Sequence, residues 1–246
     1  MSDMFVVRSL VRLLRGLGSR LGWRIAGRLQ GDYASPAELL IVHDLRVRGF
    51  ADAADVAVAT GLEVDAVGAH LADLEAAGLA RHRDGRVSGW ILTSDGRTHG
   101  EELVAAELDG TGLRDEVDAA YRRFLDVNQA FLSLCTDWQM RPDPEDPDAE
   151  PVVNDHTDLA YDGVMIDRLG ETDAAVQPVC ATLAGVLGRF GDYGGRLARA
   201  LDRVRSGNPD WVTRPMIDSY HTVWFELHEN LLATLGIERA REHAAG

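Results

Sequence analysis

The chain has 246 residues, a hydrophobic content of 46% and a net charge of −15, which fits a globular protein long enough for two domains. No apolar run approaches the roughly 18 residues that a membrane helix needs, and the N-terminus lacks the features of a secretory signal. Cys135 and Cys180 form no CxxC or Cys/His cluster, which argues against a disulfide framework and a structural zinc site. We therefore expect a cytoplasmic protein without a membrane span, cofactor or metal.

The charge is unevenly distributed along the chain, and the sequence contains arginine but no lysine. Residues 1–31 carry six Arg and one Asp (+5), residues 32–110 carry six Arg and fifteen acids (−9), and residues 111–246 carry thirteen Arg and twenty-four acids (−11). An acidic protein repels polyanions, so any contact with nucleic acid must be local and concentrated.

Residues 4–29 are expected to form one or two short basic amphipathic helices, because arginines recur at helical spacing between leucines. Two sets of arginines share a face: Arg8, Arg12 and Arg15, and then Arg20, Arg24 and Arg28. This N-terminal arm (residues 1–33) is either a segment that touches phosphate, a membrane surface or a partner, or a dimerisation helix with a solvated arginine face.

A helix is expected to begin at Ser35-Pro36-Ala37-Glu38. This stretch has the pattern of a capping box, with proline at the first helical position. The helix should run to about Arg48, where Gly49 ends it.

Two more short helices are expected after it, over residues 52–60 and 64–77. Gly61 and Gly78 follow them at the positions where a left-handed glycine stops a helix. Three helices with one tight glycine turn are typical of helix-turn-helix geometry.

A β-hairpin is expected next. Residues 79–83 and 87–93 alternate enough to form two short strands, and Asp84-Gly85-Arg86 between them is a strong turn signal.

These elements contain a series of short motifs, which follow one another along the chain: Ala54-Asp-Val-Ala, Thr60-Gly-Leu, Leu74-Glu-Ala-Ala-Gly-Leu79, Asp84-Gly-Arg86 and Leu92-Thr-Ser-Asp-Gly-Arg97. In order and spacing, residues 34–108 resemble the winged-helix domain of MarR-type bacterial transcriptional regulators. The resemblance implies binding to double-stranded DNA. It places the third helix in the major groove and the hairpin, as a wing, on the phosphate backbone or in the minor groove.

The outer face of the third helix departs from this family. The positions after the buried valine hold Gly68, Ala69 and His70, and the helix carries carboxylates but no Arg or Lys. The expected DNA-binding residues are therefore His70 on the helix and Arg81, Arg83 and Arg86 on the wing, with most of the affinity from the wing and the N-terminal arm. The alternative is that the wing arginines are solvated strand ends.

The second half, residues 111–246, is expected to be an all-α bundle. Its helices should span about 112–140, 157–169, 173–189, 193–206 and 215–235, with Gly170 as one break and a Pro- and acid-rich loop over residues 141–154. The buried face of the helix over about 112–140, its inner stripe, should include Leu125 and Leu132.

Several polar and aromatic side chains enter or flank the stripes of these helices. We expect them to line one small-molecule pocket: Tyr121, Asn128, Trp138, Tyr220, His221, Trp224 and His228. Two alternatives stay open. His221 and His228 share a helix face and could hold a metal with nearby carboxylates or with His156, or these groups are packed and satisfied by hydrogen bonds.

No enzyme motif is present: the chain lacks a nucleophile elbow, a phosphate loop and a dinucleotide-binding fingerprint. The sequence thus predicts a mainly α, non-enzymatic regulator: a basic arm (1–33), a winged helix-turn-helix domain (34–110) and a helical bundle (111–246) that binds a small-molecule effector and forms a homodimer. The alternative is a winged helix that binds proteins instead of DNA, joined to a small-molecule-binding bundle.

Overall fold

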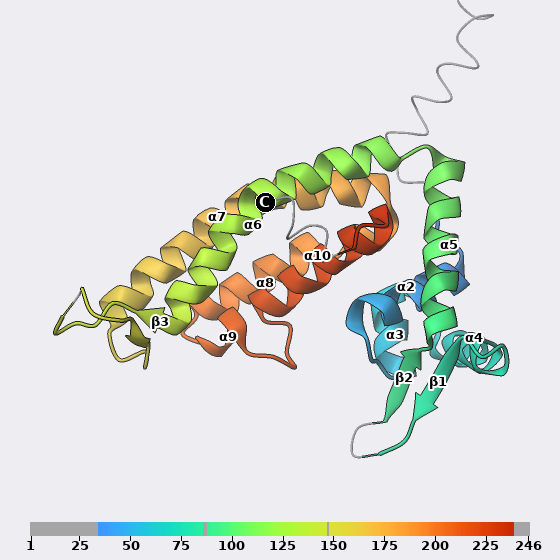
Figure 1. The fold of residues 1–246 in the computed structure, drawn as a ribbon, viewed down its shortest axis with the longest axis horizontal. Helices are drawn as coiled ribbons and strands as arrows, with labels where there is room; N and C mark the ends of the chain where they lie inside the picture. The colour runs from blue at the N-terminus through green and yellow to red at the C-terminus, as the bar shows by residue number, and fades with distance from the viewer. Residues whose placement is uncertain (1–33, 86–87, 147, 239–246) are drawn as a thin grey trace, which may run out of the picture.

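The computed structural model describes residues 34–85, 88–146 and 148–238. It is mainly helical with two small antiparallel hairpins, so the expected mainly α class is confirmed (Figure 1). The N-terminal arm and Arg86 lie outside the described residues, and the expectations for them stay predictions. Within the described part, no helix combines the length and apolar character needed to cross a bilayer.

The N-terminal unit consists of helices and a hairpin around one core. Gly49 and Gly61 end its first two helices at φ values of 75° and 71°, a left-handed conformation that glycine adopts without steric penalty. Its elements are α2 (Ala37–Arg48), α3 (Ala53–Thr60), α4 (Val64–Ala76), β1 (Ala80–Arg83), β2 (Gly89–Leu92) and α5 (Ser94–Thr111). Its core includes Ile41, Val42, Leu45, Val56, Val67, Leu71 and Leu74.

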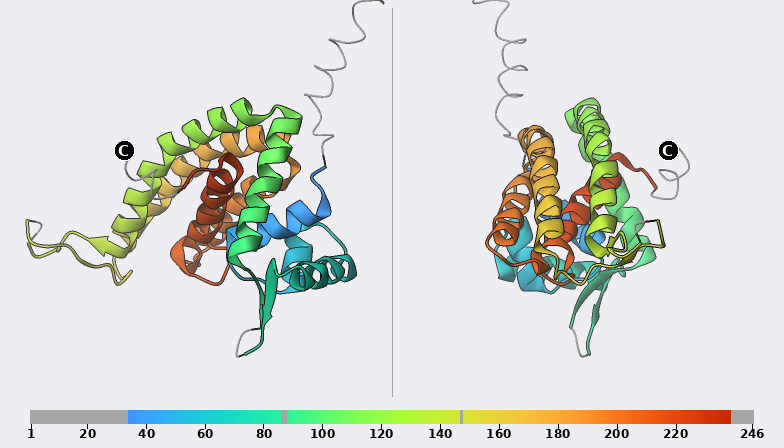
Figure 2. Two further views of the ribbon diagram at one scale, coloured as in Figure 1. Left: turned by 45° about the vertical axis from the view of Figure 1, so that its right-hand side comes forward. Right: turned by 90° about the vertical axis from the view of Figure 1, so that its left-hand side faces the viewer.

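The hairpin projects from this unit (Figures 1 and 2). Strand β1 pairs antiparallel with β2, with Ala80 opposite Leu92, and both of these side chains are buried in the core. A bridge between Ala51 and Trp90 ties the hairpin to the α2–α3 turn. The rest of β1 is exposed, so the arginines of this strand lie on the surface.

The expected capping box at the start of α2 is wrong. The Ser35 hydroxyl donates to Glu107 on α5, and Glu38 contacts His99 on α5 at 2.8 Å. Packing of α2 against α5 draws both side chains away from the helix terminus. A side-chain cap is found on α3, where Asp52 accepts from the backbone N–H of Asp55 at 2.8 Å.

The remaining helices form a two-layer bundle. The long pair α6 (Arg114–Gln139) and α7 (Leu159–Val186) packs against α8 (Tyr193–Arg205) and α10 (Tyr220–Leu235) (Figure 2). The short elements η1 (Gly188–Phe190) and α9 (Asp210–Thr213) lie in the connections. One core runs through the bundle and includes Phe124, Phe131, Leu169, Leu183, Phe190, Leu197, Tyr220, Leu227 and Leu231.

Two expected helix boundaries in the bundle are wrong. Gly170 does not break α7, which continues through it, because the packing of α7 on α6 and α8 outweighs the low helix propensity of one glycine. The absence of a Cβ there leaves room for the guanidinium of Arg205. The last helix begins at Tyr220 and not at Pro215, because the side chain of Ser219 accepts from the backbone N–H of Thr222 and caps α10.

The expected inner stripe of α6 is wrong at one position. Leu132 is 47% exposed, and Phe131 and Leu134 are buried in its place. The loop after α6 is closed by a short antiparallel pair, β3 (Met140–Arg141) and β4 (Val152–Val153), which the sequence analysis missed. Both strands have only two residues, too few for an alternating pattern.

The packing of α5 on the hairpin predicts opposite effects for two glycine substitutions. A Cβ at Gly96 would lie 1.8 Å from the backbone oxygen of Leu79, so Gly96→Ala should lower the free energy of unfolding by about 3 kcal/mol. A Cβ at Gly68, inside α4, meets nothing within 4 Å, so Gly68→Ala should raise it by about 0.5–1 kcal/mol. Urea unfolding followed by circular dichroism measures both, and equal effects would contradict this packing.

Candidate functional site

The N-terminal unit packs on the bundle through a buried layer of polar side chains. We call this layer the polar seam; it consists of His43, Glu107, Arg189, Asn230 and Thr234. Each is 5% exposed or less, counting the side chain alone for Arg189. Buried polar groups are stable only when they are hydrogen-bonded, so the two units fit together in one specific way.

Asn230 on α10 is the centre of the polar seam. Its Oδ1 accepts from His43 Nε2 at 2.7 Å and from Thr234 Oγ1 at 3.2 Å. Its Nδ2 donates to the hydroxyl of Tyr193 at 3.1 Å. One amide therefore links α2 of the N-terminal unit to α8 and α10 of the bundle.

His43 is a neutral donor in this arrangement. Burial, together with the positive charge of Arg189, lowers the pKa of His43 to about 3. The ring is therefore neutral at physiological pH and carries its proton on Nε2, because the Asn230 oxygen can only accept. Protonation of both ring nitrogens is disfavoured at any pH at which the fold is expected to persist.

An ion pair between Glu107 and Arg189 forms the second part of the polar seam. Arg189 also donates to Thr234 Oγ1 at 3.1 Å, and Ser35 donates to Glu107. A buried ion pair is stable only when such additional hydrogen bonds satisfy both partners. This pair connects α5 to η1 and α10.

A cleft of about 420 Å³ opens beside the polar seam, between the two units. One wall comes from α2 and α3 and includes the apolar side chains of Leu40, Val47 and Val58. The other wall comes from η1, α8, α10 and the turn before α10, and its side chains are mostly charged or polar. Small-molecule sites commonly have such volumes and lie between domains.

Arg196 is the anchor of the polar wall. Its Nε and one terminal nitrogen donate to the two oxygens of Asp218 at 3.0 and 2.9 Å. Its other terminal nitrogen lies 2.7 Å from Glu226 Oε2. The side chain is only 9% exposed, so these charge-assisted contacts hold it in one orientation.

Asp44 lies on the opposite wall. Its Oδ1 accepts from Arg48 Nε at 3.0 Å, whereas its buried Oδ2 has no hydrogen-bond partner among the described residues. Burial raises the pKa of Asp44 to about 6, and the negative charge of Glu226 adds to this rise. Asp44 is thus a carboxylate whose negative charge is incompletely compensated.

The expected ligand residues divide into two groups, neither of which lines this cleft. Six lie along the contact between α6 and α10: Tyr121, Asn128, Tyr220, His221, Trp224 and His228. Their interior is closely packed, with ring centroids of Phe124 and Trp224 4.9 Å apart and those of Phe131 and Trp224 4.4 Å apart. Trp224 Nε1 donates to Asn128 Oδ1 at 2.9 Å, so these two polar groups satisfy each other.

The solvent exposure of these six residues differs. Tyr121, Tyr220, Trp224 and His228 are buried, Asn128 is half-buried, and His221 lies at the exposed edge. Tyr220 donates its hydroxyl to Asp173 at 3.2 Å. In this region the packed, hydrogen-bonded alternative describes the structure better than an open pocket.

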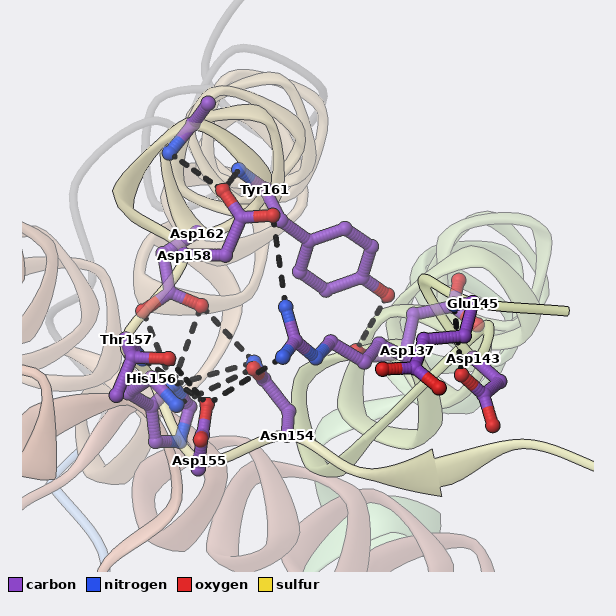
Figure 3. Close-up of polar contacts among 12 residues, drawn as sticks. Asp137, Asp143, Glu145, Asn154, Asp155, His156, Thr157, Asp158, Tyr161 and Asp162 are labelled. Atoms are coloured by element: carbon purple, nitrogen blue, oxygen red, sulfur yellow. Dashed lines mark hydrogen bonds and ion pairs between the residues drawn. The ribbon is translucent and has the colours of Figure 1, made fainter. Parts of the chain in front are cut away.

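Trp138 lies at the far end of α6, next to a different polar cluster. Figure 3 shows this cluster, which includes Asn154, His156 and Asp162. The Trp138 ring packs on His156 at 4.5 Å between centroids, and its carbonyl accepts from Asn154 Nδ2 at 3.1 Å. Asn154 Nδ2 also donates to Asp162 Oδ1 at 2.9 Å, and Asp162 lies 3.1 Å from His156 Nδ1. These contacts hold His156 at a φ of 60°, which is uncommon for a residue other than glycine.

Neither this cluster nor the helical histidines form a metal site. His156 packs on Trp138 at the end of α6, whereas His228 packs on Phe124, about four turns back along the same helix. Among the described residues, no group of three or more His, Cys, Asp or Glu side chains is placed to hold a metal ion.

The described residues expected to bind DNA all lie on the N-terminal unit. Arg81 and Arg83 are exposed on β1, and His70 is half-buried on α4. The backbone N–H of His82 donates to Glu75 Oε1 at 3.1 Å, which ties β1 to the end of α4. The structure therefore brings the hairpin and α4 together.

Sequence reasoning missed the cleft and the polar seam. The only local signals were Asp44 and Arg48 four residues apart on one helix, and Asn230 within the apolar stripe of α10. Comparison with known protein families, with curated proteins and with solved structures finds no match for this chain.

The environment of Asp44 predicts how stability depends on pH. Asp44 has a pKa of about 6 in the folded state, against an ordinary value of 3.8. Between pH 4 and 6 the native state therefore binds more protons than the unfolded state does. The free energy of unfolding should therefore fall as pH rises through this range, and the loss is complete above about pH 7. Asp44→Asn should raise the free energy of unfolding by about 1–2 kcal/mol at pH 8 and by almost nothing at pH 4.

Urea unfolding at both pH values tests this expectation. Asp126→Asn, at an exposed carboxylate on α6, is the matched control and should show no such pH-dependent gain. An Asp44→Asn variant less stable than the wild type at pH 8 would show that Asp44 is compensated in the native state.

Proposed function

We propose that this chain is a winged-helix DNA-binding transcriptional regulator whose helical bundle senses a small molecule. One observation carries the proposal: helices α2, α3 and α4 are followed by a projecting two-stranded hairpin on which Arg81 and Arg83 are exposed. This order of elements is that of a winged helix, with α4 in the position of the recognition helix. It agrees with the resemblance of residues 34–108 to MarR-type regulators.

In this proposal the hairpin supplies most of the affinity. Arg81 and Arg83 are free to lie along phosphates, whereas the outer face of α4 presents Asp65, Ala69 and Asp73. Carboxylates repel the phosphate backbone, so α4 adds little affinity and modest sequence preference. A homodimer would present two hairpins to one duplex and double the number of phosphate contacts.

The effector is proposed to act at the cleft between the two units. Helix α2 contributes to this cleft and to the core that supports α4 and the hairpin. A ligand that favours one angle between the units would therefore change how α4 and the hairpin are presented. Such a ligand shifts DNA affinity only by its differential affinity for the two arrangements.

A second candidate is a winged helix that binds protein. The observation in its favour is the outer surface of α4, which lacks Arg and Lys and exposes Val64 by 50%. Under this candidate the unit has no measurable affinity for duplex DNA. The DNA-binding experiment below therefore separates the two candidates.

Removal of the hairpin arginines should weaken DNA binding to all sequences alike. For the Arg81→Ala/Arg83→Ala variant, the log–log dependence of affinity on salt should flatten by up to about one unit per lost phosphate contact. Fluorescence anisotropy with a labelled random duplex, over a series of salt concentrations, measures this slope.

The matched control is Arg122→Ala/Arg123→Ala, which removes the same charge from an exposed face of α6. It should bind DNA as the wild type does. If both double variants lose the same affinity, only the net charge matters. If the wild type fails to bind duplex DNA even at low salt, the protein-binding candidate replaces the regulator.

His70 is expected to act differently from the arginines, because it is the one side chain on the outer part of α4 able to donate to a base edge. His70→Ala should change sequence preference, by about 1 kcal/mol or more at one base pair, with little change in affinity for random DNA. Selection of bound duplexes from a random pool measures this preference, and an unchanged profile would exclude base reading by His70.

A further inference from the structure

We infer that the cleft between the two units takes a hydrophobic amine, with its ammonium group at Asp44 and its hydrocarbon part against the α2–α3 wall. This inference deepens the proposed function, because it names the chemical class of the effector. Binding itself does not depend on DNA, and only its regulatory consequence rests on the proposed function.

Among the charged side chains that line the cleft, the carboxylates outnumber the arginines. The lining contains four arginines and five carboxylates. Each arginine already has an acidic partner. Arg196 binds Asp218 and Glu226, Arg189 binds Glu107, Arg48 binds Asp44, and Arg199 lies 3.6 Å from Asp192. An anionic ligand would have to displace one of these contacts, whereas a cation adds to the carboxylates without displacing any.

Asp44 is the carboxylate with the most to gain from a cation. Its Oδ2 is buried without a hydrogen-bond partner, and Arg48 occupies only Oδ1. The nearby Glu226 repels the charge of Asp44 and adds to the raised pKa. A buried carboxylate oxygen without a donor is unfavourable, and an ammonium group supplies both the missing donor and the opposite charge.

The α2–α3 wall, on which Asp44 itself lies, indicates what the rest of the ligand is. Val58 is 85% exposed on α3, and Leu40 and Val47 of α2 line the same cleft. Val58 offers the largest exposed apolar surface of the three, and a fully polar cation would leave that surface in water. The combination favours a ligand with one charged end and one hydrocarbon end.

Groups from every surrounding element set the pH dependence of this site. His43 stays neutral, and Arg48 and Arg196 stay charged, over the range from pH 5 to 8. The other carboxylates that line the cleft are Asp55 of α3, Asp192, Asp218 and Glu226 of α10. Alkyl ammonium groups stay protonated below about pH 10. Protonation of Asp44, with its pKa of about 6, is therefore the change expected to weaken binding, by about tenfold at pH 5 relative to pH 8.

Three probes with the same chain and different charge test the inference: hexylamine, 1-hexanol and hexanoate. Titration calorimetry on the full chain at pH 8 and about 0.15 M salt, where surface charges are screened, measures their binding. We expect hexylamine to bind at one site and at least tenfold more tightly than 1-hexanol, and hexanoate to bind most weakly. Asp44→Asn should reduce hexylamine binding at least tenfold and leave 1-hexanol unchanged, whereas Asp126→Asn should change neither.

Three results would overturn the inference: no binding of hexylamine, binding of hexanoate as tight as that of hexylamine, or hexylamine binding unaffected by Asp44→Asn. The Asp44→Asn variant is expected to fold, so loss of binding is not explained by unfolding. Duplex DNA binding, measured separately, distinguishes the two proposals. Hexylamine binding without DNA binding leaves the ligand class intact and removes the regulator, and the reverse result removes only the ligand class.

Discussion

The hydrogen bond between His43 and Asn230 joins residues 187 positions apart and is the interaction around which the two units are arranged. Both groups are buried, so any other placement of α2 on α10 would leave at least one of them without a partner. The ion pair of Glu107 with Arg189 imposes the same condition on α5. Two apolar surfaces could slide over one another, whereas this polar contact permits one arrangement.

This arrangement also creates the cleft. Because the polar seam fixes α2 against α10, Asp44 and Arg48 of α2 line the same cleft as Arg196 and Glu226 of the bundle. Burial in this contact raises the pKa of Asp44 to about 6, and the charge of Glu226 adds to the rise while Arg48 and Arg196 oppose it. The cleft therefore belongs to the contact between the units, and a ligand bound there contacts both.

Local signals predicted much of the fold. Gly49 and Gly61 end helices where expected because a left-handed residue is a property of a few neighbouring positions. The predictions that failed depend on distant partners: Ser35 binds Glu107 on another helix, and Gly170 stays helical because α7 packs on α6 and α8. The expected ligand residues were chosen as polar groups in apolar stripes, and Asn128 and Trp224 prove to satisfy each other. The cleft could not be predicted because its residues come from helices that only the fold brings together.

We propose that the contact between the two units controls DNA binding, and substitution of Arg196 is the most informative experiment on this proposal. Arg196→Met disrupts the polar wall of the cleft, whereas Arg199→Met removes the same charge one turn further along α8, at a side chain that is 63% exposed. Affinity for one duplex, measured by anisotropy at fixed salt, should change at least about fivefold in Arg196→Met and stay near the wild-type value in Arg199→Met. Equal affinities for both folded variants and the wild type would show that this contact does not control DNA binding.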